Sequence, residues 1–409
     1  MLGKAAKAMG GAAVLAVAGW AAWQWWPLGD GAAQASQASL SANNAAGSAA
    51  LSSLTAGNTL QDLGSNSGAP LSPAGQQQRR AQLMLAQQRY ERAEQTFAAY
   101  KDATRYPHES RPLAENPDQI RPFAPISEQT VGRDAQGKPV KFSLRTTQER
   151  VFLGGADSVK LTVEALDEKS VLLPLSIVSA RAQSMAESRN LAASIGVNLD
   201  FADDGAGIDL VPGDRKFTAR LSPAAQGFAQ YRGTIRILAT AQANGQEAVA
   251  HFDVVYTPGT PATWAGVREA FEAGSLNFYL KAQVQQPGRY VVSARVDDAN
   301  GVPFALLQYN DEVTAGPREF KLHLIGVLVR DKSPPFPLRL RDVEGFLLLP
   351  NQYPDRLLMP RLPGVVHTSG SYSAASFSAE EWQSEERSRY LDEYNRDVEQ
   401  ARLEVQRLK

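Results

Sequence analysis

The spacing of apolar residues changes along this chain, and each change marks a different kind of element. From about residue 128 to residue 258, apolar and polar residues alternate in short runs, which is the pattern of strands that bury one face. Glycine, proline, asparagine and aspartate separate the runs, as in the turns of a β-sandwich. The clearest runs are Val140, Phe142 and Leu144; Val159, Leu161 and Val163; Ile235 and Ile237; and Phe252, Val254 and Tyr256.

A second unit of similar length and texture is expected from residue 259 to residue 366. Its turns, at Pro287-Gly288 and at residues 297–301, contain the residue types that favour tight turns. We expect its last strand at residues 345–349. Its alternating runs are Leu276, Phe278, Leu280, Ala282 and Val284; Tyr290, Val292, Ala294 and Val296; and Phe320, Leu322 and Leu324.

Helical spacing flanks these strands on both sides. Residues 74–105 and the end of the C-terminal segment 367–409 repeat apolar positions at intervals of three and four, which is a heptad seam. Ser378 and Glu381 predict a capping box at the start of the second helix, just before Trp382. Each helix could lie on a β domain, which is the favoured arrangement, pair with the other helix, or self-associate in a homo-oligomer. The seam residues are Leu83, Ala86, Tyr90, Ala93, Phe97 and Tyr100, then Leu391, Tyr394, Val398, Ala401, Val405 and Leu408.

The first 28 residues have the pattern of a membrane-spanning segment. Lys4 and Lys7 precede an uncharged run at 8–28, close to the ~20 residues that a helix needs to cross a bilayer. Tryptophans crowd its far end, as at a membrane interface. We therefore predict a cytoplasmic tip and a transmembrane anchor at 1–28, with the rest of the chain exported. The alternative is a signal peptide cleaved near Ala33-Gln34-Ala35, which would make the protein secreted.

Two connecting segments follow different rules. Residues 29–73 are rich in Ala, Ser, Gly, Asn and Gln, which predicts a disordered tether because so little apolar surface can be buried. Residues 106–127 contain five prolines and predict a semi-rigid connector that lies along a domain surface.

Composition excludes several kinds of chemistry. The chain has no cysteine, which excludes disulfides, thiolate metal sites and cysteine nucleophiles. Its formal net charge is −1 and it has no basic block, which argues against nucleic-acid binding. The four histidines share no metal-ligand spacing, and no catalytic or nucleotide-binding motif occurs. We expect no catalysis and no cofactor other than a calcium ion.

The calcium expectation rests on an acidic, glycine-rich segment. Asp203, Asp204, Asp209 and Asp214 lie within twelve residues and could donate carboxylate oxygens to the ion. Their spacing does not fit an EF-hand loop. The other interpretation is that these residues shape turns between strands through hydrogen bonds to the backbone.

The same segment carries a family resemblance. The run DDGAGIDLVPGDRKFTARL, residues 203–221, resembles the acidic loop of bacterial immunoglobulin-like exoplasmic domains of the choice-of-anchor X type. The runs GRYVVSARVDDANG (288–301) and FKLHLIGVLVRD (320–331) are similar to edge and closing strands of that group. The resemblance covers about residues 130–350; it implies immunoglobulin-like sandwiches and no particular activity. The usual Gly-Asp-Gly-x-Tyr is replaced at 213–217, where Arg215 and Lys216 disfavour a calcium site.

Residues 331–363 alternate prolines with aromatic, aliphatic and arginine side chains. Such side chains on a proline-stiffened surface are typical of protein interfaces. The alternative is a long loop that packs over the sandwich and joins it to the C-terminal helix. The candidate partner-binding residues are Phe336, Arg339, Arg341, Tyr353 and Arg356.

Together these patterns predict a mainly β fold, with two tandem immunoglobulin-like β-sandwiches flanked by an N-terminal and a C-terminal helix and one N-terminal transmembrane helix. We expect an inner-membrane protein, mostly periplasmic, that binds or scaffolds a protein partner in an envelope assembly. One alternative is a glycan- or peptidoglycan-binding module, which calls for aromatic rings on a sheet face; only Trp264 and Trp382 lie beyond the anchor. A further alternative is a hydrolase with a site between the domains, which requires clustered carboxylates or histidines.

Overall fold

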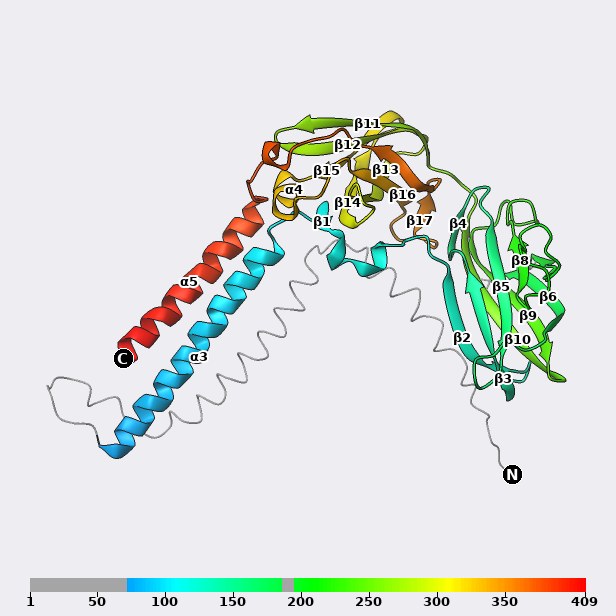
Figure 1. The fold of residues 1–409 in the computed structure, drawn as a ribbon, viewed down its shortest axis with the longest axis horizontal. Helices are drawn as coiled ribbons and strands as arrows, with labels where there is room; N and C mark the ends of the chain where they lie inside the picture. Colours follow the sequence, from blue (N-terminus) through cyan, green and yellow to red (C-terminus); the bar gives the residue numbers. More distant parts are fainter. Residues whose placement is uncertain (1–71, 186–194) are drawn as a thin grey trace, which may run out of the picture. The chain divides into compact units, whose positions relative to one another are not determined.

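The computed structural model describes residues 72–185 and 195–409 (Figure 1). Strands make up 44% of the structure and helices 22%, which confirms the prediction of a mainly β chain with flanking helices. The predicted anchor and nearly all of the predicted tether lie outside the described residues. No helix in the two described ranges is long and apolar enough to cross a membrane.

Two sheets packed on a common core form the first β-sandwich. One has the strand order β4-β10-β9-β6-β7 and the other β2-β3-β5-β8. The alternation seen in the sequence places Leu161, Ile237 and Val254 in this core, each fully buried. The strands are β2 (Ile126–Arg133), β3 (Pro139–Gln148), β4 (Phe152–Gly154), β5 (Val159–Leu166), β6 (Ser176–Ser184), β7 (Gly196–Asn198), β8 (Phe217–Leu221), β9 (Gly233–Ala243) and β10 (Gln246–Thr257).

The second β-sandwich also has two sheets. Six strands form one sheet along the path β1-β14-β13-β16-β17, with β18 also paired to β16, and β11-β12-β15 form the other. Phe278, Tyr290 and Phe320 lie fully buried in its core. The strands are β1 (Ser110–Pro112), β11 (Ala262–Glu272), β12 (Ser275–Val284), β13 (Gly288–Asp297), β14 (Pro303–Val313), β15 (Gly316–Leu324), β16 (Arg339–Leu348), β17 (Arg356–Leu358) and β18 (Leu362–Thr368).

The second sandwich is built from two separate parts of the chain. The predicted connector contributes β1, which pairs with β14 before the first sandwich begins. Proline is tolerated there because β1 is an edge strand. The 3-10 turns η1 (Leu113–Glu115) and η2 (Pro117–Gln119) follow. Arg295 of β13, fully buried, donates to the carbonyl oxygen of Gln119 and pairs with Glu344 at 2.9 Å. The first sandwich is therefore inserted into the second.

Two long helices lie side by side and antiparallel: α3 (Pro73–Ala103) and α5 (Glu385–Leu408) (Figure 1). Tyr100 of α3 contacts the rings of Tyr390 and Tyr394 of α5, and Arg89 pairs with Glu404 at 3.3 Å. The contacts near the end of α3 are made with the start of α5, and the contact nearer the start of α3 is made with the end of α5, so the two helices run in opposite directions. The favoured expectation, in which each helix lies on a β domain, is therefore wrong, and pairing of the two helices is correct.

Three further predictions are wrong in the C-terminal third. Residues 345–349 are not the last strand, because β17 and β18 follow. Residues 331–363 are not a long loop, because they hold the end of α4 (Gly326–Lys332), all of β16 and β17, and the start of β18. The last helix does not begin with the box of Ser378 and Glu381; Ser384 is its N-cap and accepts a hydrogen bond from the amide of Arg387 at 3.0 Å.

Candidate functional site

The structure places the predicted seam residues on the least exposed side of each helix. From Gln76 to Tyr100, all the side chains of α3 that do not belong to the seam are exposed. The tyrosine contacts between the helices show that the two seams face each other. Few of these side chains are fully buried, because a pair of helices covers each seam from one side only. The residues are Leu83, Ala86, Tyr90, Ala93, Phe97 and Tyr100, then Leu391, Tyr394, Val398, Ala401, Val405 and Leu408.

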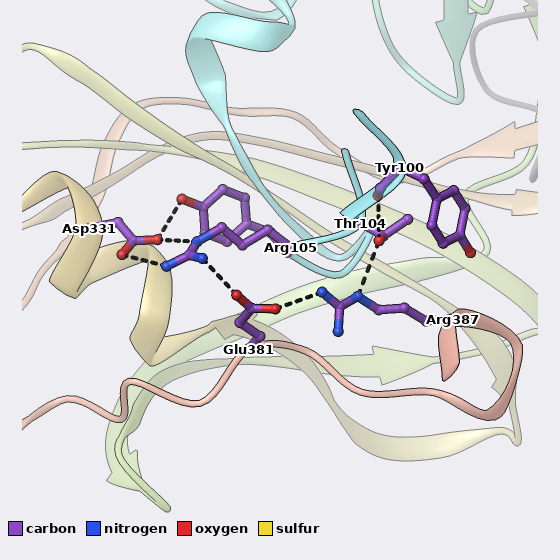
Figure 2. A network of polar contacts seen from close by, with 7 residues as sticks. Tyr100, Thr104, Arg105, Asp331, Glu381 and Arg387 are labelled. Atoms are coloured by element: carbon purple, nitrogen blue, oxygen red, sulfur yellow. Dashed lines mark hydrogen bonds and ion pairs between the residues drawn. The ribbon is translucent and has the colours of Figure 1, made fainter. Parts of the chain in front are cut away.

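A chain of charged side chains fixes one end of the helix pair (Figure 2). Arg105, just beyond α3, donates two hydrogen bonds to Asp331 of α4, at 2.7 and 2.9 Å, and a third to Glu381 at 2.7 Å. Glu381 also accepts from Arg387 of α5 at 2.7 Å. Arg387 in turn donates to the hydroxyl of Thr104 at 3.1 Å. This base network, which also includes Tyr106, ties both helices to the second sandwich.

The side chains of the base network are partly or fully buried, which strengthens the interactions between their charges. The hydrogen bonds from Arg105 hold the pKa of Asp331 below its usual range. Burial, and then the hydrogen bond from its own hydroxyl to Asp331 at 2.8 Å, raises the pKa of Tyr106 to about 12. The side chain of Arg387 is 2% exposed, so Glu381 neutralises a cation that water hardly reaches. Each of these charges has an opposite charge beside it within the chain, so the network can hold the two helices in place on the second sandwich.

Close backbone packing delivers Glu381 to this position. The amide of Ser378 donates to the carbonyl oxygen of Gly274 at 2.9 Å, where the turn between β11 and β12 meets the segment before α5. Gly326, at the start of α4, lies against the same point. A Cβ there would stand 2.1 Å from the carbonyl oxygen of Gly274. Only glycine fits this approach without moving backbone.

Large apolar side chains are exposed on the half of the helix pair away from the base network. Met84 and Leu85 of α3 are 61% and 50% exposed, and Leu403 of α5 is 54% exposed. Met84 is sixteen residues before Tyr100, which is about 24 Å along a helix axis. We call these three residues the distal apolar side chains.

The predicted partner-binding residues lie on or beside β16 and β17, and most of them have contacts within the chain. Phe336 packs against the second core. Arg341 and Arg356 pair with aspartates of the same sandwich, at 2.6 and 2.7 Å. Arg339 lies at the start of β16. Tyr353, between β16 and β17, is 50% exposed. The segment is thus largely a structural part of the sandwich.

Three of the four predicted calcium ligands come together. Carboxylate oxygens of Asp203, Asp209 and Asp214 lie within 4.8 Å of one another. Asp204 stands outside this group, and its carboxylate accepts a hydrogen bond from the amide of Ala206 at 2.9 Å. Backbone amides also donate to Asp203 and Asp209, and the amide of Gly205 is the main cause of the lowered pKa of Asp209. These bonds show the turn-forming role directly, and calcium binding stays a prediction.

The second sandwich holds the two tryptophans beyond the predicted anchor and two of the histidines, while His251 lies in β10 of the first sandwich. Trp264 and Trp382 both pack against its core, and the indole of Trp264 donates to a backbone carbonyl oxygen at 2.7 Å. His323 pairs with Asn277 at 2.7 Å, and His367 pairs with Glu269 at 3.0 Å. The structure does not bring these two histidines to a common metal site with the acidic group.

Sequence reasoning missed the base network because its members are far apart along the chain. Arg105 is 226 residues from Asp331 and 276 residues from Glu381. The sequence holds one modest signal. Thr104 and Arg105 directly follow α3, a few residues beyond the last seam residue, where a charged side chain would face whatever covers that seam. Finding their partners required the tertiary fold.

Comparisons with known proteins give no family. No family model matches this chain, and no curated protein matches it. Among solved structures, a DUF4785 family protein from Legionella pneumophila is similar over 56% of this chain and 57% of its own, with 12% identity and a TM-score of 0.38. A fragment of titin is similar over 59% of this chain and 88% of its own, with 10% identity and a TM-score of 0.17. The chain therefore matches little more than half of the Legionella protein.

Proposed function

We propose that this protein is a membrane-anchored periplasmic scaffold, without catalysis of its own, that binds a protein partner through its helix pair. One observation carries the proposal: a helix pair held at one end by the base network exposes large apolar side chains at the other. Met84 is 61% exposed and Leu403 is 54% exposed. Apolar side chains on a positioned helical surface are what protein partners bury.

The remaining parts of the proposal rest on the sequence. The uncharged run at 8–28 supports an inner-membrane anchor with its N-terminus in the cytoplasm, and residues 29–73 supply a tether. The packing of two sheets in each sandwich, together with the loop resemblance, supports immunoglobulin-like domains. Such domains present loops and strand edges to partners, and here they would also hold the helix pair at its base.

The test is affinity capture of the full-length protein from gently solubilised membranes, followed by quantitative mass spectrometry. The tag is placed at the N-terminus, so that the end of α5 stays free. Met84→Glu combined with Leu403→Glu puts two charges onto the distal apolar side chains. We expect a partner protein that is recovered with the natural chain to be lost with this double variant.

The matched control adds the same charges at exposed polar positions of the same helices, as Gln95→Glu combined with Gln400→Glu. We expect this control to keep the partner. Recovery of a second copy of this chain, lost in the same way, would make the helix pair a homo-oligomer interface. Equal recovery with both double variants, or recovery of cell-wall material alone, would contradict the proposal.

A further inference from the structure

A row of hydroxyl side chains crosses the outer face of the sheet β2-β3-β5-β8. Ser127 is paired with Thr147, Thr147 with Thr162, and Thr162 with Thr218. Directly paired residues of neighbouring strands project on the same side of a sheet. Leu161, next to Thr162 in β5, is fully buried in the core, so the hydroxyl row lies on the opposite, outer face. Each of the four strands contributes one hydroxyl, but that of Thr218 is buried, so a ligand can reach only Ser127, Thr147 and Thr162.

A hollow of about 520 Å³ opens in this face. Its volume is within the range of about 300–1,000 Å³ that small-ligand sites have. Ser127, Thr147 and Thr162 line it, and the first two hydroxyls are bonded to each other at 3.0 Å. Thr162 and Glu164 lie at its floor, because they are only 9% and 6% exposed although they are on the outer face. The hollow therefore has depth and a polar floor.

Charges of both signs surround the hydroxyl row. On one side, Arg145 lies 3.5 Å from Glu164. On the other side, the carboxylate of Glu149 accepts from the backbone amide of Lys160 at 3.0 Å, and the ammonium of Lys160 donates to a backbone carbonyl oxygen at 2.9 Å. Lys216 completes the set, so that three cations and two carboxylates line the hollow.

The residues that line the hollow disfavour charged and apolar ligands. An anion would meet the carboxylate of Glu164 at the floor, and a cation would meet Arg145 and Lys160. An apolar ligand would find Pro125 as its only apolar partner among the lining residues. A hydroxyl both donates and accepts hydrogen bonds without bringing a charge, so it can use the hydroxyl row and the flanking charges together.

We infer that the outer face of the sheet β2-β3-β5-β8 is a binding site for a neutral, hydroxyl-rich chain, a short stretch of glycan. The hollow is open to solvent on the outer face of the sheet, so a chain can lie across the strands there. No aromatic ring lines it, so stacking adds nothing and the affinity is set by hydrogen bonds. The site belongs to the first sandwich and does not depend on the proposed role of the helix pair.

The test measures binding of soluble neutral tetrasaccharides, with chitotetraose and maltotetraose as probes, to the full-length protein by calorimetry. The detergent must lack a sugar headgroup. Thr147→Val removes one hydroxyl of the row at nearly constant size. Its control is Thr240→Val, the same change at a partly exposed position of β9 in the opposite sheet. Ser127→Ala, on the exposed edge strand β2, replaces Thr147→Val if the latter lowers the melting temperature.

We expect at least one neutral tetrasaccharide to bind at millimolar or lower concentration. Loss of one hydroxyl that bonds the ligand should weaken this binding by about ten-fold, and Thr240→Val should leave it unchanged. The inference fails if neither tetrasaccharide binds, or if the row variants bind as well as the natural chain. It also fails if a heparin fragment binds in their place with an affinity that falls steeply with salt, since that result would mark a polyanion surface.

Discussion

Glu381→Ala is the sharpest test of how the helix pair is held. The carboxylate of Glu381 accepts hydrogen bonds from Arg105 and Arg387, each at 2.7 Å. Arg105 keeps its two bonds to Asp331 when Glu381 is removed. Arg387 keeps only the hydroxyl of Thr104, although its own side chain is 2% exposed. The substitution therefore leaves a buried cation without a counter-charge.

The expected magnitude follows from burial. Breaking a buried ion pair from one side costs about 3–5 kcal/mol, because the remaining charge stays out of water. Glu381 is itself 24% exposed, which allows water to replace part of the lost interaction, so we expect a loss of about 2–3 kcal/mol. The pair of Glu399 and Arg402 on the same helix is 46% and 52% exposed, and Glu399→Ala should cost about 0–1 kcal/mol.

The measurement is hydrogen exchange of the α5 amides, because the substitution should open one end of the helix pair before the sandwiches unfold. A second variant checks the cause. Glu381→Ala combined with Arg387→Met removes both charges and should exchange more slowly than Glu381→Ala alone, since no buried cation remains. The reasoning is refuted if Glu381→Ala costs no more than Glu399→Ala, or if the double variant exchanges as fast as the single one.

Three other predictions test neighbouring features. Gly326→Ala forces backbone apart at Gly274 and should lower the free energy of unfolding by about 1–3 kcal/mol in urea titration; an unchanged midpoint would contradict the packing. The pKa of Tyr106 is raised to about 12, so its contribution to stability should be fully present below the unfolded value of about 10 and be lost as pH rises through the folded value. Urea titration across this pH range should show that loss in the natural chain and a smaller one in Tyr106→Phe. If the aspartates bind calcium, the melting temperature should be higher in excess calcium than in chelator, and Asp214→Asn should abolish that difference. An unchanged melting temperature would mean that the aspartates only form turns.

The sequence predicts the strands and the helix seams because both are periodic burial patterns. Val159, Leu161 and Val163 alternate in β5 and are all fully buried. The spacing from Leu83 to Tyr100 marks the one side of α3 that is not exposed. A pattern of this kind predicts which face of a helix or strand is buried, but it does not identify the element that packs against that face. The spacing therefore predicts both seams correctly, while the favoured expectation that a β domain covers each seam is wrong.

What the sequence could not predict depends on contacts between distant segments. β1 has only three residues and ends in a proline, and its partner Leu307 lies almost two hundred residues later. The N-cap of α5 also depends on contacts between distant segments. Ser378 with Glu381 satisfies the local rule for a capping box, yet Ser384 is used, because the carboxylate of Glu381 is taken by Arg105 and Arg387. A tertiary ion pair outweighs a local motif worth about 1 kcal/mol.

The order of segments also constrains where a partner could meet the helix pair. The chain reaches α3 directly from residues 29–72, so the end of the pair away from the base network is the end nearest the proposed tether. Met84 lies eleven residues after Pro73, which is about 16 Å along the helix. If residues 8–28 cross the membrane, Met84 and Leu85 lie closer to it in sequence than the base network does, and Leu403 lies on the same half of the helix pair. The proposed partner should therefore be a membrane protein or a membrane-bound assembly, and shortening the tether should impair its capture before it affects the sandwiches.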